Sequence, residues 1–238
     1  MTTTYVYVTG AESGVGKSTV CLSLLAQLLS AGYAPGQLAY IKPVTQCTQT
    51  QPVAEFCRQT GIVCEDLGCL VFYQNFSRDF IDGLTASSVE LLAQVIASIR
   101  AIGQDKSVVI IDGMGDPAAG SVVGVANVDV ALAVAAKVIF VGKPGIGAAI
   151  DNTVLCATFM QCKGLHTIGV IYNAIPIEIV ADMKNYVSKR LSVFLPTITL
   201  LGFVAKCPEY NVKNLPQWFD SFVDKQLLLR DWLGLGGD

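Results

Sequence analysis

A glycine-rich segment near the N-terminus has the residue types and spacing needed to hold phosphate groups. Residues 8–19 read Val-Thr-Gly-Ala-Glu-Ser-Gly-Val-Gly-Lys-Ser-Thr. Gly14 and Gly16 have no Cβ, so nearby backbone N–H groups can converge on phosphate oxygens. Lys17 can reach the β- and γ-phosphates, and the hydroxyl of Ser18 can ligate Mg²⁺. These residues predict that the chain binds a nucleotide.

The segments on either side of this loop are the ones that such a loop requires. An alternating apolar run at 5–9 predicts a strand, and Val20, Leu24 and Leu28 recur at helical spacing over 17–31. In a strand–loop–helix unit the positive end of the helix dipole points at the phosphates. The residues expected to contact the nucleotide are Ser13, Gly14, Val15, Gly16, Lys17, Ser18 and Thr19.

Asp112 is the candidate for a second magnesium ligand. It follows the apolar run at 108–111, which predicts a buried strand. Ligands of open α/β sheets gather at the carboxyl ends of the strands, so this carboxylate is expected beside the phosphates. The alternative is a structural aspartate that caps the turn formed with Gly113 and Gly115.

Lys42 ends a second predicted strand, at 38–42, because Pro43 fixes its own φ and has no N–H to donate. The lysine would therefore emerge beside the phosphate loop. A cation at that position can stabilise charge on a phosphoryl group during transfer. The alternative is a solvated surface lysine, and the spacing alone leaves the two equally open.

Strand and helix patterns alternate along the rest of the chain. Further strands are expected at 137–142, 167–172 and 197–204, and further helices at 52–60, from the Ser87–Glu90 capping box to 100, at 148–163 and from Pro176 onward. This order predicts right-handed crossovers and a doubly wound, mainly parallel sheet of the P-loop NTPase type. With no linker or repeat in the sequence, we expect one α/β domain over 1–238.

The C-terminal residues 215–233 carry aromatic and apolar side chains at helical spacing. We expect a helix there that packs on the sheet or on a partner subunit. The alternative is a membrane-targeting helix, but acidic residues balance the basic ones on its polar face, whereas interfacial helices are usually basic.

Composition excludes several classes of function. Apolar residues make up 52% and charged residues 15% of the chain, which suits a sheet covered on both faces and leaves surface that a homodimer could bury. The net charge of −3, without a basic cluster, excludes a typical nucleic-acid binder. The eight cysteines include no C-x-x-C pair and there is one histidine, so we expect free thiols in a reducing compartment. With no recognisable signal peptide and no membrane span, we expect a cytoplasmic protein.

Several segments together resemble dethiobiotin synthetase, an ATP-dependent member of the P-loop proteins. They are Val8-Thr9-Gly10 to Lys17-Ser18, Ala31-Gly32-Tyr33, Lys42-Pro43-Val44, Ile111-Asp112-Gly113, Val141-Gly142, the run from Gly169 to Asn173, Leu201-Gly202-Phe203 and Cys207-Pro208-Glu209. The resemblance therefore spans nearly the whole chain. Its middle and later parts, notably residues 120–124, are also similar to the P-loop domain that precedes some bacterial phosphotransacetylases.

The resemblance implies an enzyme of biotin biosynthesis that carboxylates a diamine with CO₂, phosphorylates the carbamate with Mg·ATP and closes a ring urea. Lys17 and Lys42 would be the catalytic residues, holding the γ-phosphate and the carbamate. Ser18 and Asp112 would hold Mg²⁺. The residues implied to contact the adenine side of the nucleotide are Asn173, Lys206 and Glu209.

The sequence departs from this family mainly on the acceptor side. Its members have Glu where Asp112 stands and a carboxylate where Gly14 stands, and Val53 falls near the position of a further acidic metal ligand. Their Ser-Pro-His segment, which helps hold the diamine, is replaced here by residues 75–83. That segment contains Arg78, Asp79 and Asp82, which are either an acceptor site for an ionised small molecule or a local Arg–Asp turn.

Three functions follow from these observations. The first is an ATP- and Mg²⁺-dependent cyclo-ligase that acts on a small molecule and needs neither nucleic acid nor membrane. The second is a nucleotide-sensing regulatory module with little turnover, like the phosphotransacetylase P-loop domain. The third, a partition-type switch dimer, is disfavoured because such proteins carry a signature lysine where this chain has Glu12.

Overall fold

A parallel sheet forms the centre of the protein. The computed structural model describes residues 2–46, 51–208 and 214–235, and within them seven strands pair in the order β4-β2-β6-β1-β7-β8-β9, all parallel. The strands are β1 (Thr4–Gly10), β2 (Leu38–Ile41), β4 (Val63–Glu65), β6 (Val108–Asp112), β7 (Lys137–Gly142), β8 (Ile168–Ile175) and β9 (Thr199–Ala205). The expected doubly wound α/β fold is confirmed.

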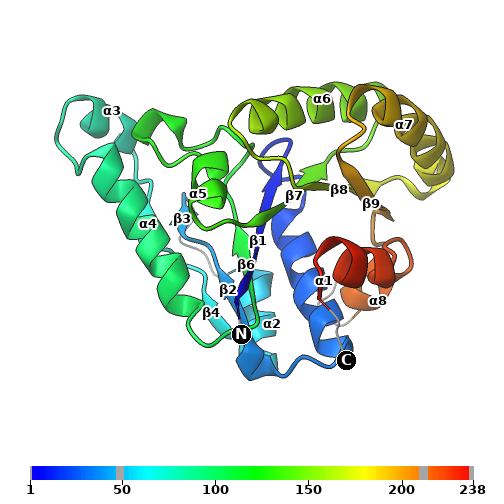
Figure 1. Ribbon diagram of the computed structural model, residues 1–238, viewed down its shortest axis with the longest axis horizontal. Helices are drawn as coiled ribbons and strands as arrows, with labels where there is room; N and C mark the ends of the chain where they lie inside the picture. Colours follow the sequence, from blue (N-terminus) through cyan, green and yellow to red (C-terminus); the bar gives the residue numbers. More distant parts are fainter. Residues whose placement is uncertain (1, 47–50, 209–213, 236–238) are drawn as a thin grey trace.

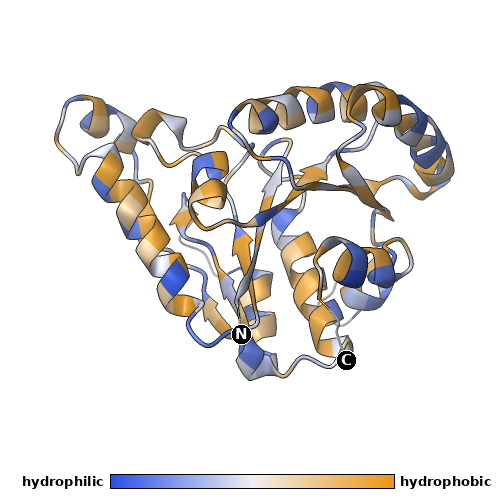
Figure 2. Ribbon diagram, viewed as in Figure 1, coloured by the Kyte–Doolittle hydropathy of each residue, from blue (hydrophilic) through white to orange (hydrophobic). Residues whose placement is uncertain are grey.

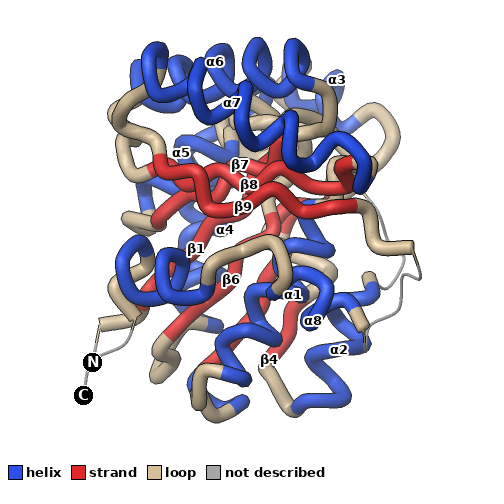
Figure 3. The backbone as a smooth tube through the Cα atoms, turned by 90° about the vertical axis from the view of Figure 1, so that its right-hand side faces the viewer, coloured by secondary structure: helices blue, strands red, loops and turns tan. Residues whose placement is uncertain are grey.

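Helices cover both faces of this sheet (Figures 1 and 3). One face carries α1 (Lys17–Ser30), α2 (Pro52–Thr60), α8 (Leu215–Asp220) and the π-helical segment η4 (Gln226–Trp232). The other carries α4 (Ser88–Ile102), α5 (Asn127–Ala133), α6 (Ile146–Cys162) and α7 (Val180–Phe194). None of the helices in the described ranges is long and apolar enough to cross a membrane.

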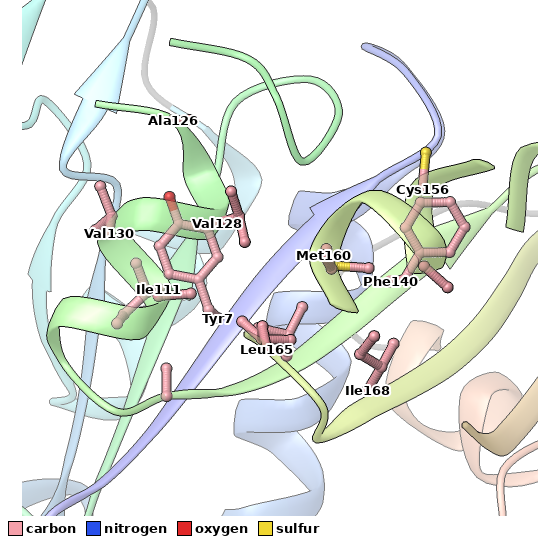
Figure 4. Close-up of a cluster of buried hydrophobic side chains, with 14 of the residues drawn as sticks. Tyr7, Ile111, Ala126, Val128, Val130, Phe140, Cys156, Met160, Leu165 and Ile168 are labelled. Carbon is pink, nitrogen blue, oxygen red and sulfur yellow. The ribbon is translucent and has the colours of Figure 1, made fainter. Parts of the chain in front are cut away.

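The strands are apolar on both sides because each side faces a helical layer. In β1, Val6 and Val8 pack toward α1, whereas Tyr7 belongs to the cluster on the α5 and α6 side. Successive side chains of a strand point to opposite faces, which explains this division. Figure 2 shows apolar residues along the central strands and α1, and Figure 4 shows Tyr7, Ile111 and Phe140 in the core beneath α5 and α6.

Local sequence signals account for several helix boundaries. Pro52 opens α2 and Gly61, in the left-handed region with φ 77°, ends it. At the start of α4 the Ser87 hydroxyl accepts a hydrogen bond from the Glu90 amide, and the Glu90 carboxylate accepts one from the Ser87 amide. This is the expected capping box.

One expectation about the elements was wrong. The C-terminal segment is not one helix: α8 ends at Asp220, Val223 then pairs in antiparallel fashion with Gly202 of β9, and η4 follows. The Asp224 carboxylate accepts hydrogen bonds from the amides of Gln226 and Leu227 and so starts a new helical segment. The helix expected from Pro176 is present: Pro176 directly precedes a short 3₁₀ turn, η3 (Ile177–Ile179), which continues into α7.

The region between α2 and α4 contains short elements that the sequence patterns did not reveal. Besides the edge strand β4, these are β5 (Leu70–Val71) and the helix α3 (Phe76–Ile81). β5 forms a small parallel sheet with β3 (Val44–Thr45), which lies between β2 and α2. Two further 3₁₀ turns are η1 (Pro35–Gln37) and η2 (Ser121–Val123). The helix α3 belongs to residues 75–83, the segment that stands in place of the family's diamine-holding residues. Like β3, it lies at the same end of the sheet as the phosphate loop (Figure 1).

Candidate nucleotide-binding site

The glycine-rich loop connects β1 to α1 in a conformation that requires glycine. Gly14 and Gly16 have φ values of 85° and 89°, which side chains with a Cβ rarely adopt. A Cβ on Gly16 would also collide with the side-chain amide of Asn173. The loop is anchored at its start, because the Gly10 amide donates to the Gly115 carbonyl at 3.1 Å and the Ala11 amide to the Val141 carbonyl at 2.9 Å.

A cavity of about 340 Å³ opens over this loop. The expected residues that line it are Ser13, Gly14, Gly16, Lys17, Ser18, Thr19 and Lys42. Val15 is buried beneath the loop and does not line the cavity. The remaining lining residues were not expected from the sequence: Thr45, Gln46, Gln51, Gly113, Met114 and Gly115.

Asp112 is the centre of the polar contacts in the site. Its side chain is fully buried, and its Oδ2 accepts hydrogen bonds from Ser18 Oγ at 2.7 Å and from Tyr40 OH at 2.9 Å. Lys42 Nζ lies 3.6 Å from the same oxygen. The other oxygen, Oδ1, is buried and has no hydrogen-bond partner in the described part of the chain.

The strand geometry explains why these side chains meet. β2 and β6 are neighbours, with Tyr40 opposite Ile110. Tyr40 and Ile110 both pack in the cluster on the α1 side. Side chains two residues further along a strand point to the same face, so Lys42 and Asp112 also point toward α1, whose first turn carries Ser18. Lys42 is thus 15% exposed and beside the loop, unlike a solvated surface lysine.

The donor set of this centre fits a magnesium ion. Mg²⁺ prefers oxygen ligands and is typically held by one or two protein groups together with water and phosphate oxygens. The Ser18 hydroxyl and the Asp112 carboxylate are two such groups in direct contact. The buried Oδ1 of Asp112 has no hydrogen-bond partner among the described residues, so it is available to coordinate a cation. Elsewhere in the described ranges no group of three or more His, Cys, Asp or Glu side chains is placed to hold a metal.

Lys17 lies on the floor of the cavity and is 8% exposed. Its Nζ donates to the Glu12 carbonyl at 3.0 Å, which bends the side chain back over the loop. Burial lowers the pKa of Lys17, and Lys42 lowers it further, while Asp112 raises it. Phosphate oxygens in the cavity would favour the charged form.

Tyr40 is a site residue that sequence reasoning missed. It is fully buried, and burial together with the neighbouring Asp112 raises the pKa of its hydroxyl well above its ordinary value, so it stays a donor. Its position two residues before Lys42 places it on the same face of the strand, but its contact with Asp112 depends on the register between β2 and β6, which the sequence alone does not give.

Of the residues expected on the adenine side, the two that the structure describes lie in different parts of it, and only Asn173 contacts the phosphate loop. Asn173, in β8, is buried, and its Nδ2 donates to the Val15 carbonyl at 3.1 Å, so it braces the phosphate loop. Lys206 follows β9, is exposed and does not line the cavity. Glu209 lies outside the described residues.

The acceptor candidates lie around α3, next to a second cavity. This cavity, of about 440 Å³, is lined by Gln46, Arg78 and residues 72–77, and it shares Gln46 with the cavity over the phosphate loop. The Asp79 carboxylate accepts a hydrogen bond from the Tyr73 hydroxyl at 2.8 Å, and Asp82 is exposed after the end of α3. A local Arg–Asp ion pair is not among the contacts of the described residues.

Glu12 has a structural role at the edge of the site. Its carboxylate forms an ion pair with Lys143, at 3.0 Å, in the turn that follows β7. The position that holds a lysine in partition-type switches is therefore an acid with a partner in its own chain.

Comparisons with known proteins agree with this fold. The AAA domain family matches residues 4–209 of the chain. A curated relative, the ATP-dependent dethiobiotin synthetase BioD of Geobacillus sp. (strain WCH70), is 29% identical over 92 residues, which is 38% of this chain and 38% of that protein. The aligned part thus spans well under half of the relative's length.

Solved structures show the same fold at low sequence identity. The MinD cell division protein of Aquifex aeolicus superimposes with a TM-score of 0.55 at 15% identity, over 99% of this chain and 98% of that chain. The MinC:MinD complex of the same organism gives 0.54 at 13% identity, over 91% and 86%. Given the match over residues 4–209, the chain belongs to the AAA domain family and is a dethiobiotin synthetase-like P-loop NTPase.

Proposed function

We propose that the protein is an ATP- and Mg²⁺-dependent ligase that activates a carboxylate or carbamate by phosphorylation for attack by an amine. The observation that supports this most directly is the cluster of Lys17, Lys42, Ser18 and Asp112 around one cavity. Two cations and a metal-binding pair are what phosphoryl transfer needs, because the reaction depends on positioning and charge neutralisation.

The residues have separate tasks in this proposal. Lys17 binds the β- and γ-phosphates of ATP, and Lys42 lies between the γ-phosphate and the acceptor oxygen. When bound between Ser18 and Asp112, Mg²⁺ would neutralise charge on the phosphate oxygens. Tyr40 keeps the Asp112 carboxylate turned toward Ser18.

The proposed reaction needs no nucleophile from the enzyme. A carbamate or carboxylate oxygen forms a bond to the γ-phosphorus while the bond from that phosphorus to the β-γ bridging oxygen breaks and ADP leaves. The amine then forms a C–N bond at the activated carbonyl carbon, the C–O bond to phosphate breaks, and the amine proton is lost to solvent. A ring urea results when the amine and carbamate belong to one molecule.

The acceptor is proposed to bind in the cavity beside α3. Arg78 suits a carboxylate or phosphate of the acceptor, and Asp79 and Asp82 suit an amine or a cation. The shared residue Gln46 connects this cavity to the cavity over the phosphate loop, so a small molecule there would lie next to the γ-phosphate.

A second candidate function is a nucleotide-sensing module with little turnover. It is favoured by one observation: the segment that would hold the diamine is here the helix α3, with a different set of side chains. The contact between Lys42 and Asp112 favours the ligase, since a sensor needs only the phosphate loop.

Phosphate release from Mg·ATP distinguishes the two. We expect release to rise when diaminopelargonate and bicarbonate are added and to be lost in Lys17→Ala, while Lys189→Ala, an exposed site on α7, behaves as wild type. ATP binding without stimulation would favour the sensor or another acceptor. No binding of ATP would contradict both functions.

The quaternary structure proposed with this function is a homodimer. Exposed apolar side chains on α6 and α7, among them Leu155 at 70% and Val193 at 67% exposure, offer surface that a second copy could cover. Light scattering coupled to size-exclusion chromatography measures this: a mass near twice 25.3 kDa is expected, and a monomer at micromolar concentration would contradict it.

A further inference from the structure

Asn127 joins the loop after β6 to the core of the protein. It is the first residue of α5 and is 3% exposed. Its Oδ1 accepts a hydrogen bond from the Tyr7 hydroxyl at 2.8 Å. Its Nδ2 donates to the carbonyls of Met114 and Asp116 and lies 3.3 Å from Thr9 Oγ1. The amide therefore uses both its acceptor and its donors inside the protein.

The orientation of this amide is fixed by its neighbours. Carbonyl groups only accept hydrogen bonds, so the side that faces Met114 and Asp116 has to be the NH₂ group. Tyr7 is 1% exposed, and burial raises its pKa far above its ordinary value, so its hydroxyl stays a donor to Oδ1. Figure 4 shows Tyr7 beside Val128 and Val130 of α5.

The loop held by Asn127 is a wall of the nucleotide cavity. Gly113, Met114 and Gly115 line that cavity beside Lys17 and Lys42. The backbone of the loop is tied to β1 as well, because the Gly113 amide donates to the Val8 carbonyl at 2.8 Å and Gly115 accepts from Gly10. A Cβ on Gly113 would collide with Tyr7 and Asn127, so the loop packs closely against this network.

The residues that follow the loop are fastened to the same helix. The Asn127 amide donates to the Ala119 carbonyl at 3.1 Å, and the Val128 amide donates to the Pro117 carbonyl at 3.1 Å. The Asp116 carboxylate caps this stretch by accepting from the Ala118 amide at 2.8 Å. Residues 113–119 thus have backbone contacts to β1 at one end and to α5 at the other.

We propose that Asn127 is a positioning residue that holds residues 113–116 in one conformation against the bound nucleotide, so that this loop is a fixed wall and not a nucleotide-dependent switch. In switching NTPases the moving segments are ordered chiefly by contacts to the γ-phosphate and its metal, and they are released on hydrolysis. Here the side-chain and backbone contacts that order the loop are made within the protein, to Tyr7, Thr9 and α5, and none of them needs a phosphate or a metal. A fixed wall suits an enzyme that aligns two substrates.

Hydrogen exchange followed by mass spectrometry tests this proposal without reference to any acceptor. In the wild type, amides of residues 113–119 should exchange slowly without nucleotide, and their rates should change less than about twofold with Mg·ADP or Mg·ATPγS. Rapid exchange without nucleotide, with protection only by Mg·ATPγS, would overturn the proposal and identify a switch. This outcome is independent of whether the protein is a ligase.

The matched variants are Asn127→Asp and Asn152→Asp. Asn127→Asp keeps an acceptor for Tyr7 but turns a carboxylate oxygen toward two carbonyl oxygens, so the 113–119 amides should exchange at least about tenfold faster. Asn152, on α6, donates only to the Ala148 carbonyl at 2.7 Å, and its variant should match the wild type. If Asn127→Asp does not fold, Tyr7→Phe removes only the hydroxyl and should raise exchange in the same segment by a smaller factor.

Nucleotide affinity separates positioning from a general structural role. The loop lines the cavity next to Lys42, the lysine proposed to face the γ-phosphate, so Asn127→Asp should weaken binding of a fluorescent ATP analogue about tenfold and of the ADP analogue less than about twofold. Faster exchange in 113–119 with an unchanged ratio of ATP to ADP affinity would overturn the positioning role. An unchanged exchange rate in Asn127→Asp would overturn the proposal that Asn127 holds this loop in one conformation.

Discussion

Ser18 and Asp112 lie 94 residues apart in the chain, and their side chains are joined by a hydrogen bond of 2.7 Å between Oγ and Oδ2. The bond connects the first turn of α1 to the end of β6, the two elements that carry the candidate magnesium ligands. Tyr40 donates to the same carboxylate oxygen, while the other oxygen has no partner within the described ranges. A cation bound at this position would be coordinated by the unpartnered oxygen.

Ser18→Ala removes one of the two proposed magnesium ligands and leaves the other in place. The concentration of Mg²⁺ needed for half-maximal binding of a fluorescent ATP analogue should rise by about tenfold or more, because one charge-assisted oxygen contact is lost. Ser18→Thr keeps the hydroxyl and should stay close to the wild type. Equal magnesium dependence in Ser18→Ala and the wild type would contradict the assignment of Ser18.

Lys17→Ala should remove the stabilisation that ATP gives. A ligand present at 100 times its dissociation constant stabilises a protein by about 2.7 kcal/mol. For a chain of this size that corresponds to a rise in Tm of about 5–10 °C. Differential scanning fluorimetry with Mg·ATP should show this rise for the wild type and Lys189→Ala and none for Lys17→Ala. A full shift in Lys17→Ala would contradict the proposed phosphate contact.

Tyr40→Phe tests the support that the tyrosine gives to Asp112. Both side chains are fully buried, and the lost hydrogen bond has an ionised acceptor. The free energy of unfolding, measured by urea denaturation, should therefore fall by about 1.5–3 kcal/mol. Tyr186→Phe, at a position 53% exposed, should leave it unchanged. Equal stability of the two variants would mean that the Tyr40 hydroxyl contributes nothing to the buried centre.

The parts of the fold that were predicted correctly have local sequence signals. The strand–loop–helix unit at residues 4–30 follows from alternating apolar residues, two glycines and a helical repeat, all within one short stretch. The capping box at Ser87 and the apolar strands β6 and β7 are equally local. Each of these signals is complete without knowledge of any distant residue.

The parts that were missed depend on pairing between distant segments. β4 has three residues and is a strand only because it pairs with β2. The C-terminal helix breaks because Val223 pairs with Gly202. The role of Tyr40 requires the register between β2 and β6, and that of Asn127 requires α5 to lie over β1. None of these contacts has a periodic pattern that a single sequence displays.

The titration of Lys17 should make nucleotide binding pH-dependent. Burial lowers the pKa of Lys17 from its usual value near 10.5 in the protein alone, and phosphate oxygens would raise it again on binding. Above the lowered pKa, ATP binding must take up a proton, so its affinity should fall as the pH rises toward 10.5. The unfolding free energy without nucleotide should rise over the same window, because the unfolded chain binds the proton more strongly there.

Calorimetry in two buffers of different ionisation enthalpy measures this proton directly. Uptake on ATP binding should increase as the pH rises from neutral toward 10.5 for the wild type. Lys189→Ala should show the same uptake, since Lys189 is exposed on α7. Binding without proton uptake across this range would mean that Lys17 is already fully charged in the unbound protein.

Arg78 should affect the acceptor and leave the nucleotide alone. It lines the cavity beside α3, which shares Gln46 with the cavity over the phosphate loop but contains none of the loop residues. Arg78→Ala removes the paired N–H donors that recognise a carboxylate or phosphate, so the KM for an anionic acceptor should rise about tenfold to a hundredfold, with the KM for ATP changed less than about twofold. Arg78→Lys keeps the charge but lacks the paired N–H donors, so its KM for the acceptor should lie between those of the wild type and Arg78→Ala. A parallel loss of ATP affinity in Arg78→Ala would place this arginine on the nucleotide, and an unchanged acceptor KM would leave α3 outside the acceptor site.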